Sequence, residues 1–411
     1  MAAVKVKTGR AGANARTESG GRPPRHRPGR RGRLRLSRRG RRIRTGIAVL
    51  LLVGLTWLGF SIGGALTAPG TDSTAARLAE WGRTHHLGWA VTTLEQKQYA
   101  MNKPATGGSV VGGVPTVHPV DPAGGSSTGS TTQRGPRLAA PPAPIRPLAP
   151  SRLAREGQWQ ALFGVGKHTA ARVAFLRPDT THTSYLVDVV WMDPSLLRFK
   201  LFPGYQVPGP PMTAPDQLLG ADAKSVLATF NSGFQMGDSH GGYWQNGRTI
   251  KRLRSGAASM VLSKDGHLSV KAWPGGPPGH QVVAVRQNLS LLIQGGKISP
   301  LVSSANTKTW GVTVGNKDFV WRTGIGVRAD GSIVFVVGPA LNVQTLATIL
   351  QRAGAINAME LDINPEWTNY LTYTHTTSGG AVPHRLGTDT MPSLVRYLQP
   401  SSRDFVGVFA R

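Results

Sequence analysis

Three carboxylates and one arginine in the stretch 322–367 could carry glycoside or phosphate chemistry. Glu360 and Asp362 stand two apart at the end of a strand pattern, and strand side chains two apart point to the same face. Two neighbouring carboxylates separate their pKa values, so that one can act as an acid and the other as a base. Asp362 is the first candidate for nucleophile or base, because it opens a loop, where catalytic groups are commonly presented. Glu366 could take the second role in place of Glu360.

Four further residues are candidates for binding an anionic sugar ligand. Arg322 carries a permanent cation whose planar fork fits two oxygens of a phosphodiester; the alternative is a strand arginine in an ion pair. Asn231 follows a strand pattern in a turn of small residues, where its amide either holds a ligand oxygen or is an ordinary turn residue. His240, in a Gly-rich loop, is either a proton donor or polar surface. Trp367 could stack on a sugar ring.

Positioning these groups requires a hairpin, a helix and a further strand, and the pattern of residues 322–362 predicts all three. The first two strands are joined by a hairpin turn at Asp330-Gly331. A helix follows, begun by Asn342 as its N-cap and closed at Gly354. The last strand then leads to the two neighbouring carboxylates.

The rest of the domain 156–411 alternates apolar and polar residues as strands do, with a second hairpin turn at 265–266. Helical patterns are sparse: 341–353 is the clear case and 391–397 is predicted as a second helix. We therefore predict an α+β fold of mostly antiparallel sheets with few helices, preceded by one transmembrane helix and a disordered linker.

The chain before this domain changes composition several times. Residues 1–45 contain 14 Arg and 2 Lys against a single Glu, so no core can form there. The uncharged stretch 46–66 is long enough to cross a bilayer. Arginines before such a stretch favour a cytoplasmic N-terminus with everything after Ala68 outside, although a cleaved signal peptide is the alternative.

The predicted organisation is a basic disordered cytoplasmic tail at 1–45, a transmembrane helix at 46–66, juxtamembrane helices at 73–99, a Pro/Gly/Ser-rich linker at 100–155 and the globular domain at 156–411. This order predicts a single-pass protein of the cell membrane with an extracytoplasmic C-terminal domain.

The formal net charge of +28 identifies the kind of partner to expect. About half of it lies in the tail, which can contact anionic lipid, so nucleic-acid binding is not expected. The remaining positive charge suits an anionic or phosphate-bearing glycan of the cell envelope.

The absence of cysteine from the sequence excludes disulfides, thiolate metal sites and a cysteine nucleophile. No spacing of His and Asp predicts a metal site, so no cofactor is expected. A divalent cation bound by Asp362 and Glu360 is the remaining option.

Three segments, TFNSGF at 229–234, RTGIGVRADG at 322–331 and LATILQRAGAINAMELD at 346–362, resemble motifs of the phosphodiester glycosidase family and occur in the same order. The resemblance implies a hydrolase. It also implies that Asn231, Thr323 and Asp362 belong to its site, with Arg322 holding the phosphate.

The chain departs from the family after Asp362. The family has a Gly-Gly-Gly-Ser run whose backbone N–H groups could approach a phosphate, whereas this chain has Ile-Asn-Pro-Glu-Trp at 363–367. Either Asn364 and Trp367 replace those contacts, or the activity is altered. We expect a membrane-anchored hydrolase of sugar 1-phosphodiester bonds in an envelope glycan, using two-carboxylate chemistry. The alternative is a non-catalytic polysaccharide-binding module of the same fold.

Overall fold

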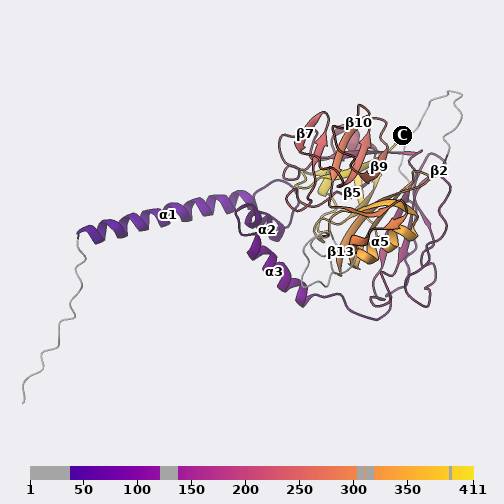
Figure 1. The fold of residues 1–411 in the computed structure, drawn as a ribbon, viewed down its shortest axis with the longest axis horizontal. Coiled ribbons are helices and arrows are strands. Elements are labelled where there is room, and N and C mark those ends of the chain that lie inside the picture. The colour runs from indigo at the N-terminus through magenta and orange to yellow at the C-terminus, as the bar shows by residue number, and fades with distance from the viewer. Residues whose placement is uncertain (1–37, 121–137, 303–309, 311–318, 388–390) are drawn as a thin grey trace, which may run out of the picture. The chain divides into compact units, whose positions relative to one another are not determined.

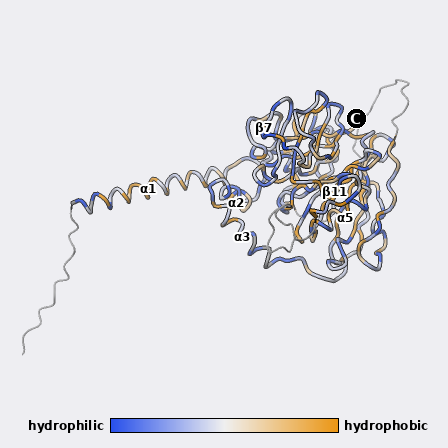
Figure 2. Tube along the Cα trace, in the orientation of Figure 1, coloured by the Kyte–Doolittle hydropathy of each residue, from blue (hydrophilic) through white to orange (hydrophobic). Residues whose placement is uncertain are grey.

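The computed structural model describes residues 38–120, 138–302, 310, 319–387 and 391–411. The chain divides into two compact units, 1–59 and 60–411. Helix α1 (Arg38–Leu66) contains a 25-residue apolar stretch, Arg42–Leu66, with a mean hydropathy of 2.1. Figure 2 shows the apolar residues along this helix. Its length and composition fit a membrane span, and a signal sequence has the same properties.

Two further helices follow α1. Helix α2 (Thr74–Thr84) begins after the N-cap Ser73, whose hydroxyl accepts the N–H of Ala76 at 3.1 Å. Helix α3 (Gly88–Met101) follows, so the predicted juxtamembrane segment 73–99 forms two helices. The two helices are joined by an ion pair of 2.5 Å between Arg83 and Glu95.

The C-terminal domain consists of three sheets, and every pairing between the strands of its described part is antiparallel (Figure 1). The eight-stranded sheet has the order β1 (Gln160–Val165), β2 (His168–Leu176), β3 (Val187–Met192), β14 (Ile333–Leu341), β13 (Val320–Arg328), β15 (Ala355–Glu360), β11 (Leu291–Gln294) and β12 (Lys297–Ile298).

Two five-stranded sheets complete the architecture. One has the order β7 (Arg248–Lys251), β6 (Tyr243–Gln245), β10 (Val282–Gln287), β8 (Ala258–Ser263) and β9 (Leu268–Ala272). The other has the order β17 (Ala381–Arg385), β16 (Tyr370–His375), β5 (Val226–Asn231), β18 (Phe405–Ala410) and β4 (Leu197–Phe202). The predicted α+β class with mostly antiparallel sheets is confirmed.

The helices of the described domain are short, namely α4 (Gly220–Ser225), α5 (Val343–Arg352) and the 3-10 helices η1 (Pro300–Val302) and η4 (Arg396–Leu398). The prediction for α5 is confirmed, because the Asn342 side chain accepts the N–H of Thr345 at 2.7 Å and Gly354 follows the helix with φ +93°. The hairpin turn before β14 is confirmed as well, with Gly331 at φ +83°.

The predicted helix at 391–397 is wrong, since only the single 3-10 turn η4 forms in this segment. Pro392 has no N–H to donate, and the short run up to Pro400 leaves few residues that could make an α-helical ladder. The segment instead turns so that Arg396 and Tyr397 are buried.

Strand β14 is buried on both faces and therefore separates two parts of the core. Phe335 lies on one face, where its ring packs 4.9 Å from Phe230 and 5.5 Å from Tyr370. Val334 and Val336 lie on the other face, in the apolar cluster that includes the buried side of α5. The central sheet is thereby covered by a second sheet and by a helix.

Parts of the predicted linker 100–155 pack against the domain. The side chains of Val114 and Ile145 are each only 2% exposed. The N–H of Val120 donates to the Leu162 carbonyl at 2.8 Å, and the N–H of Ile145 donates to Gly157 at the same distance. These extended segments cover the β1 edge of the large sheet, which would otherwise present unpaired backbone groups.

A fully buried ion pair joins the two smaller sheets. Arg286 on β10 lies 2.7 Å from the Asp404 carboxylate, which immediately precedes β18, and neither side chain is exposed. Arg286 also donates to the carbonyls of Gln287 and Phe234. Because a buried guanidinium without its carboxylate is very unfavourable, this pair should be essential to the arrangement.

We predict that Asp404→Asn lowers the free energy of unfolding by about 3–5 kcal/mol, because it leaves Arg286 charged and uncompensated. Chemical denaturation of the full chain in detergent would measure the change. The matched control is Asp222→Asn, which breaks a half-exposed pair with Lys200 and should cost less than about 1 kcal/mol. Equal effects of the two substitutions would contradict the role given to the buried pair.

Candidate active site

The end of strand β15 brings Asp362 next to two other predicted site residues. The ladder between β13 and β15 continues beyond the end of β15, with the N–H of Leu361 donating to the Thr323 carbonyl at 2.8 Å and the N–H of Thr323 donating to the Asp362 carbonyl at 2.9 Å. The Thr323 hydroxyl donates to the Asp362 carbonyl at 2.9 Å. Asn231, at the end of β5, donates its amide to that hydroxyl at 2.8 Å. Three distant segments thus meet at one point.

The Asp362 carboxylate is buried, with 5% of the residue exposed, and is held by backbone groups alone. Its Oδ1 accepts the N–H of Ile363 at 2.7 Å and the N–H of Asn364 at 2.9 Å. Burial raises the pKa of Asp362 to about 6, although the cation of Arg403 and the two N–H donors oppose the rise, and the Glu80 carboxylate adds to it. A buried carboxyl that titrates near neutrality suits proton transfer or nucleophilic attack.

Arg322 and Glu360 lie in the interior rather than at the surface. They are 1% and 0% exposed, and the Arg322 Nη1 donates to the Glu360 Oε1. The Nε of Arg322 donates to the Leu341 carbonyl at 2.9 Å. In this position Arg322 holds the ends of β13, β14 and β15 together, and a ligand role for either residue stays a prediction.

Glu366 and Asn364 belong to the loop that follows Asp362. The Asn364 side chain accepts the N–H of Glu366 at 2.9 Å, which closes a local turn. The Glu366 carboxylate accepts the N–H and the hydroxyl of Ser73, each at 3.0 Å, and lies 3.3 Å from Arg396. The loop is thereby fastened to the chain segment before α2.

Trp367 is 3% exposed and contacts two arginines that the sequence analysis did not single out. The guanidinium carbons of Arg396 and Arg403 lie over its ring, 4.6 Å and 4.7 Å from the ring centroid. Both arginines come from the last 16 residues of the chain, where no spacing relates them to Asp362. The sequence shows these two arginines only as basic residues on either side of Pro400.

His240 lies outside this network, with an exposed side chain and a left-handed backbone, φ +48°, in the loop before β6. Its predicted role in proton transfer stays a prediction. Within the described residues, no group of three or more His, Asp or Glu side chains is arranged to hold a metal ion.

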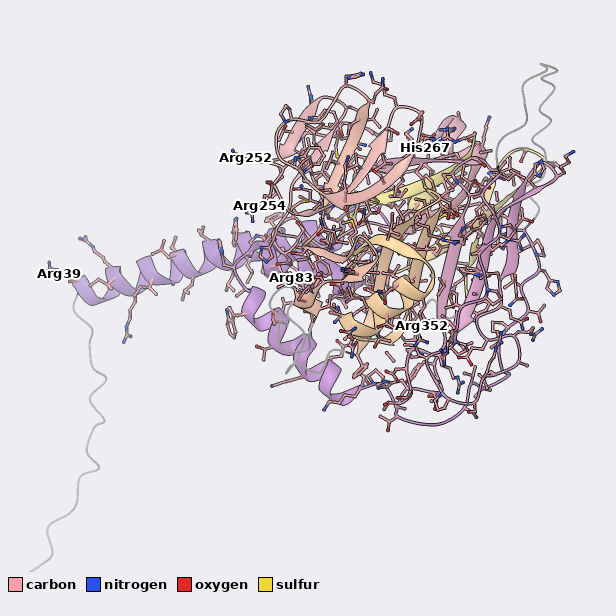
Figure 3. All side chains as sticks on the ribbon, turned by 45° about the vertical axis from the view of Figure 1, so that its right-hand side comes forward. Arg39, Arg83, Arg252, Arg254, His267 and Arg352 are labelled. Atoms are coloured by element: carbon pink, nitrogen blue, oxygen red, sulfur yellow. The ribbon has the colours of Figure 1, made fainter. Side chains whose placement is uncertain are left out.

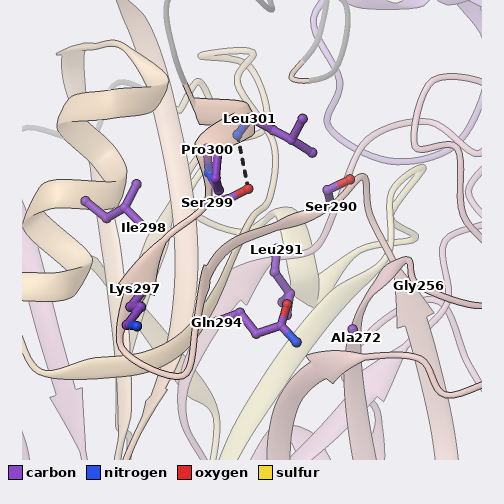
Figure 4. Close-up of a pocket in the computed structure, with 10 residues that line it drawn as sticks. All are labelled: Gly256, Ala272, Ser290, Leu291, Gln294, Lys297, Ile298, Ser299, Pro300 and Leu301. Carbon is purple, nitrogen blue, oxygen red and sulfur yellow. Dashed lines mark hydrogen bonds between the residues drawn. The ribbon is translucent and has the colours of Figure 1, made fainter.

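A cavity of about 310 Å³ lies elsewhere in the domain, between β9, β11 and the turn η1 (Figure 4). Its lining includes Gln294, Lys297 and Ser299, and none of the residues predicted from the sequence to bind or act on a ligand. The candidate site is therefore the cluster around Asp362 and Trp367, which the segment before α2 covers.

A buried carboxylate with a raised pKa beside arginine cations is typical of functional sites. The sequence model of the phosphodiester glycosidase family matches residues 223–362, which end at Asp362. The predicted resemblance to the phosphodiester glycosidase family, whose members are hydrolases, is therefore confirmed over this stretch of the chain.

Solved structures also resemble this chain. The zebrafish N-acetylglucosamine-1-phosphodiester alpha-N-acetylglucosaminidase catalytic domain, described as auto-inhibited by its pro-peptide, is 18% identical with a TM-score of 0.39. The similarity covers 62% of this chain and 88% of that one. A hypothetical protein from Synechocystis is 13% identical over 58% of this chain and 64% of its own, with a TM-score of 0.30. Comparison with curated proteins gives no match.

We predict that Asp362→Asn stabilises the fold at neutral pH and not in acid. Because burial raises the pKa from 3.8 to about 6, the folded wild type holds a proton that the unfolded chain has lost, so its stability falls as pH rises through this window. The full shift corresponds to about 3 kcal/mol. Denaturation of both proteins at pH 4 and pH 8 should show the variant gaining in relative stability toward pH 8.

Asp330→Asn is the control with the opposite sign. Burial opposes ionisation there, but hydrogen bonds from Ser332 lower the pKa of Asp330 overall. The wild type should therefore gain stability over this variant as pH rises through the acid range. If the stability difference caused by Asp362→Asn did not change with pH, the raised pKa would be contradicted.

Proposed function

We propose that this protein hydrolyses the glycosidic bond of a sugar 1-phosphodiester in an envelope glycan, from the outer side of the membrane. The observation that carries this proposal is the Asp362 carboxylate, which lies buried just after β15 at the end of the segment that matches the family, and whose pKa is raised by burial to about 6. Above that pH the carboxylate is ionised and can act as nucleophile or general base.

The chemistry requires little acid assistance. In the net reaction, the bond from the anomeric carbon to the phosphate oxygen breaks and a water oxygen takes its place. The phosphate leaves as a stable anion, so protonation of the leaving group is less important than in an ordinary glycoside. Glu366 is better placed than Glu360 to act as the second carboxylate, because Glu360 is fully buried with Arg322.

Asn231 and Thr323 support Asp362 in this scheme. Their side chains form a chain of hydrogen bonds that ends on the Asp362 carbonyl. A carboxylate held by a rigid support needs less reorganisation when it reacts. These two residues position Asp362, and substrate contact by them remains part of the proposal.

The location and the substrate class rest on charge and hydropathy. An apolar helix that fits a membrane span follows the arginine-rich tail, which favours an outward-facing domain. Arg252 and Arg254 are exposed after β7, as Figure 3 shows. Such cations suit a polyanionic glycan, and the tail suits anionic lipid.

A non-catalytic glycan-binding module of the same fold is the second candidate. The observation that favours it is the loop 363–367, in place of the glycine-rich run of the family. The N–H groups of Ile363 and Asn364 already donate to Asp362, so they are not available to a phosphate. Cleavage of a sugar phosphodiester by the protein distinguishes the hydrolase from the binding module.

We predict that the full chain, in detergent, cleaves a chromogenic sugar 1-phosphodiester, and that kcat/KM falls as pH drops below about 6, where Asp362 takes up a proton. Asp362→Asn should reduce kcat by at least about a hundredfold, because it removes the charge and keeps the size. Asp330→Asn, at the hairpin turn, is the control for a similar change outside the site. Binding of substrate without cleavage by the wild type would favour the binding module.

We also predict that protease added to intact cells or protoplasts degrades the domain after Ala68 and spares the tail. The reason is the cluster of arginines before an uncharged span, which retains the N-terminus in the cytoplasm. Antibodies against each end of the chain would follow the fragments. A C-terminal domain that resists protease until the membrane is opened would reverse the proposed orientation.

A further inference from the structure

Two arginine side chains converge on Trp367 beside the candidate catalytic carboxylate. Arg396 comes from η4 and Arg403 from the loop before β18, and they are 2% and 7% exposed. Arg403 is also close enough to Asp362 to influence its pKa. Two permanent cations that are so well shielded from solvent require anionic partners, because burial of an unpaired charge is very costly in free energy.

Besides Glu366, which lies 3.3 Å from Arg396, the anionic partners come from one short segment that lies far away in the sequence. The Asp72 carboxylate lies 2.6 Å from the Nη1 of Arg396, and the Glu80 carboxylate lies 2.7 Å from the Nη2 of Arg403. Gln235 also donates to Glu80. The segment 72–80 therefore places its two acidic residues one on each arginine.

The same segment is docked tightly on either side of these contacts. The Pro69 carbonyl accepts the Tyr205 hydroxyl at 2.9 Å. Gly70, at φ +89°, lies so close to the Pro400 carbonyl that no larger residue would fit. Ser73 donates twice to Glu366, as described above. The acidic residues are therefore held in place by shape as well as by charge.

The arginines still have donors to offer. Among the described residues, the Nε and Nη1 of Arg403 and the Nε of Arg396 are buried and find no hydrogen-bond acceptor. A guanidinium carries five N–H groups in a planar fork that matches phosphate oxygens. Asp72 and Glu366 on Arg396, and Glu80 on Arg403, leave these three donors unused, whereas a tetrahedral phosphate could engage more of them.

We propose that Arg396 and Arg403 form the binding site for the phosphodiester anion of the substrate, and that Asp72 and Glu80 compete with the substrate for it. The ligand class rests on the proposed function. When the phosphodiester replaces the carboxylates of Asp72 and Glu80, the two arginines keep an anionic partner. The exchange therefore avoids the free-energy cost of an unpaired buried charge. The segment 72–80 must move away for the substrate to reach Asp362.

The simpler interpretation is that these ion pairs only fasten α2 to the domain. The two interpretations predict opposite results when the acidic side chains are neutralised. Under simple fastening, the loss of Asp72 and Glu80 weakens the fold and brings no gain in anion binding. Under competition, the same change frees the arginines, and anion binding becomes tighter.

Binding of dimethyl phosphate to the full chain in detergent, followed by phosphorus NMR, tests the proposal without any need for turnover. Asp72→Asn combined with Glu80→Gln should lower the Kd at least about tenfold, equivalent to about 1.4 kcal/mol. Arg403→Gln should raise the Kd by at least the same factor. Uncharged trimethyl phosphate, which has a similar shape, should not bind to any of these proteins.

Glu95→Gln is the matched control, because Glu95 contacts only Arg83 among the described ion pairs and lies on α3. It should leave the Kd of the wild type unchanged. An unchanged or higher Kd in a folded double variant would overturn the proposal. If the double variant failed to fold, hydrogen exchange of the wild type would decide, since dimethyl phosphate should lower the amide protection of residues 72–84 and an unaltered pattern would contradict competition.

Failure of the proposed function can be told apart from failure of this site. Dimethyl phosphate binding that responds to these substitutions in a protein without turnover would leave the anion site standing and remove the hydrolase. Turnover of a sugar phosphodiester with a KM unaffected by Arg403→Gln would support the hydrolase and contradict the anion site.

Discussion

The hydrogen-bond ladder between β13 and β15 is the constraint on which the candidate site depends. It continues from Thr323 of β13 to Leu361 and Asp362, after β15 has ended, and so fixes the backbone of Asp362 beside β13. Gly324 pairs with Glu360 at the last regular step, and a side chain there would press against Leu350 and Leu346 of α5. The position of the carboxylate thus follows from close packing of a helix on the sheet.

The chain has few acidic residues for its many basic ones, with 20 Asp and Glu against 48 Lys and Arg. Several carboxylates therefore serve as buried partners of arginine, as Glu156 does for Arg177 and Asp404 for Arg286. Asp362 differs, because among the described ion pairs none includes it and its oxygen is held by backbone N–H groups. A carboxylate without a tight cation keeps a higher pKa and its reactivity.

Features that depend on neighbours in the sequence could be predicted. The turn at Gly331, the cap at Asn342 and the strand end at Asp362 each need only a local pattern, and the structure contains all three elements. The turn chemistry of glycine and asparagine is strong enough to set them.

Features that depend on tertiary contacts could not be predicted. A strand pattern does not show which face meets the interior, so Arg322 resembled a surface cation although it is 1% exposed. Arg396 and Arg403 join Asp72 and Glu80 across more than 300 residues, and the pairing exists only after folding. The expected helix at 391–397 is replaced by the 3-10 turn η4, in which Arg396 and Tyr397 are buried.

The shortness of the chain between α1 and Asp72 limits how far the pair Arg396 and Arg403 can lie from the end of α1. Five residues separate Leu66 from Asp72, so the docked arginine site can lie no more than about 20 Å from the end of the apolar helix. If α1 spans a bilayer, a docked segment 72–80 holds the arginine pair within this distance of the membrane surface. The release proposed above would then add the length of α2 and α3 to the tether between the apolar helix and the domain.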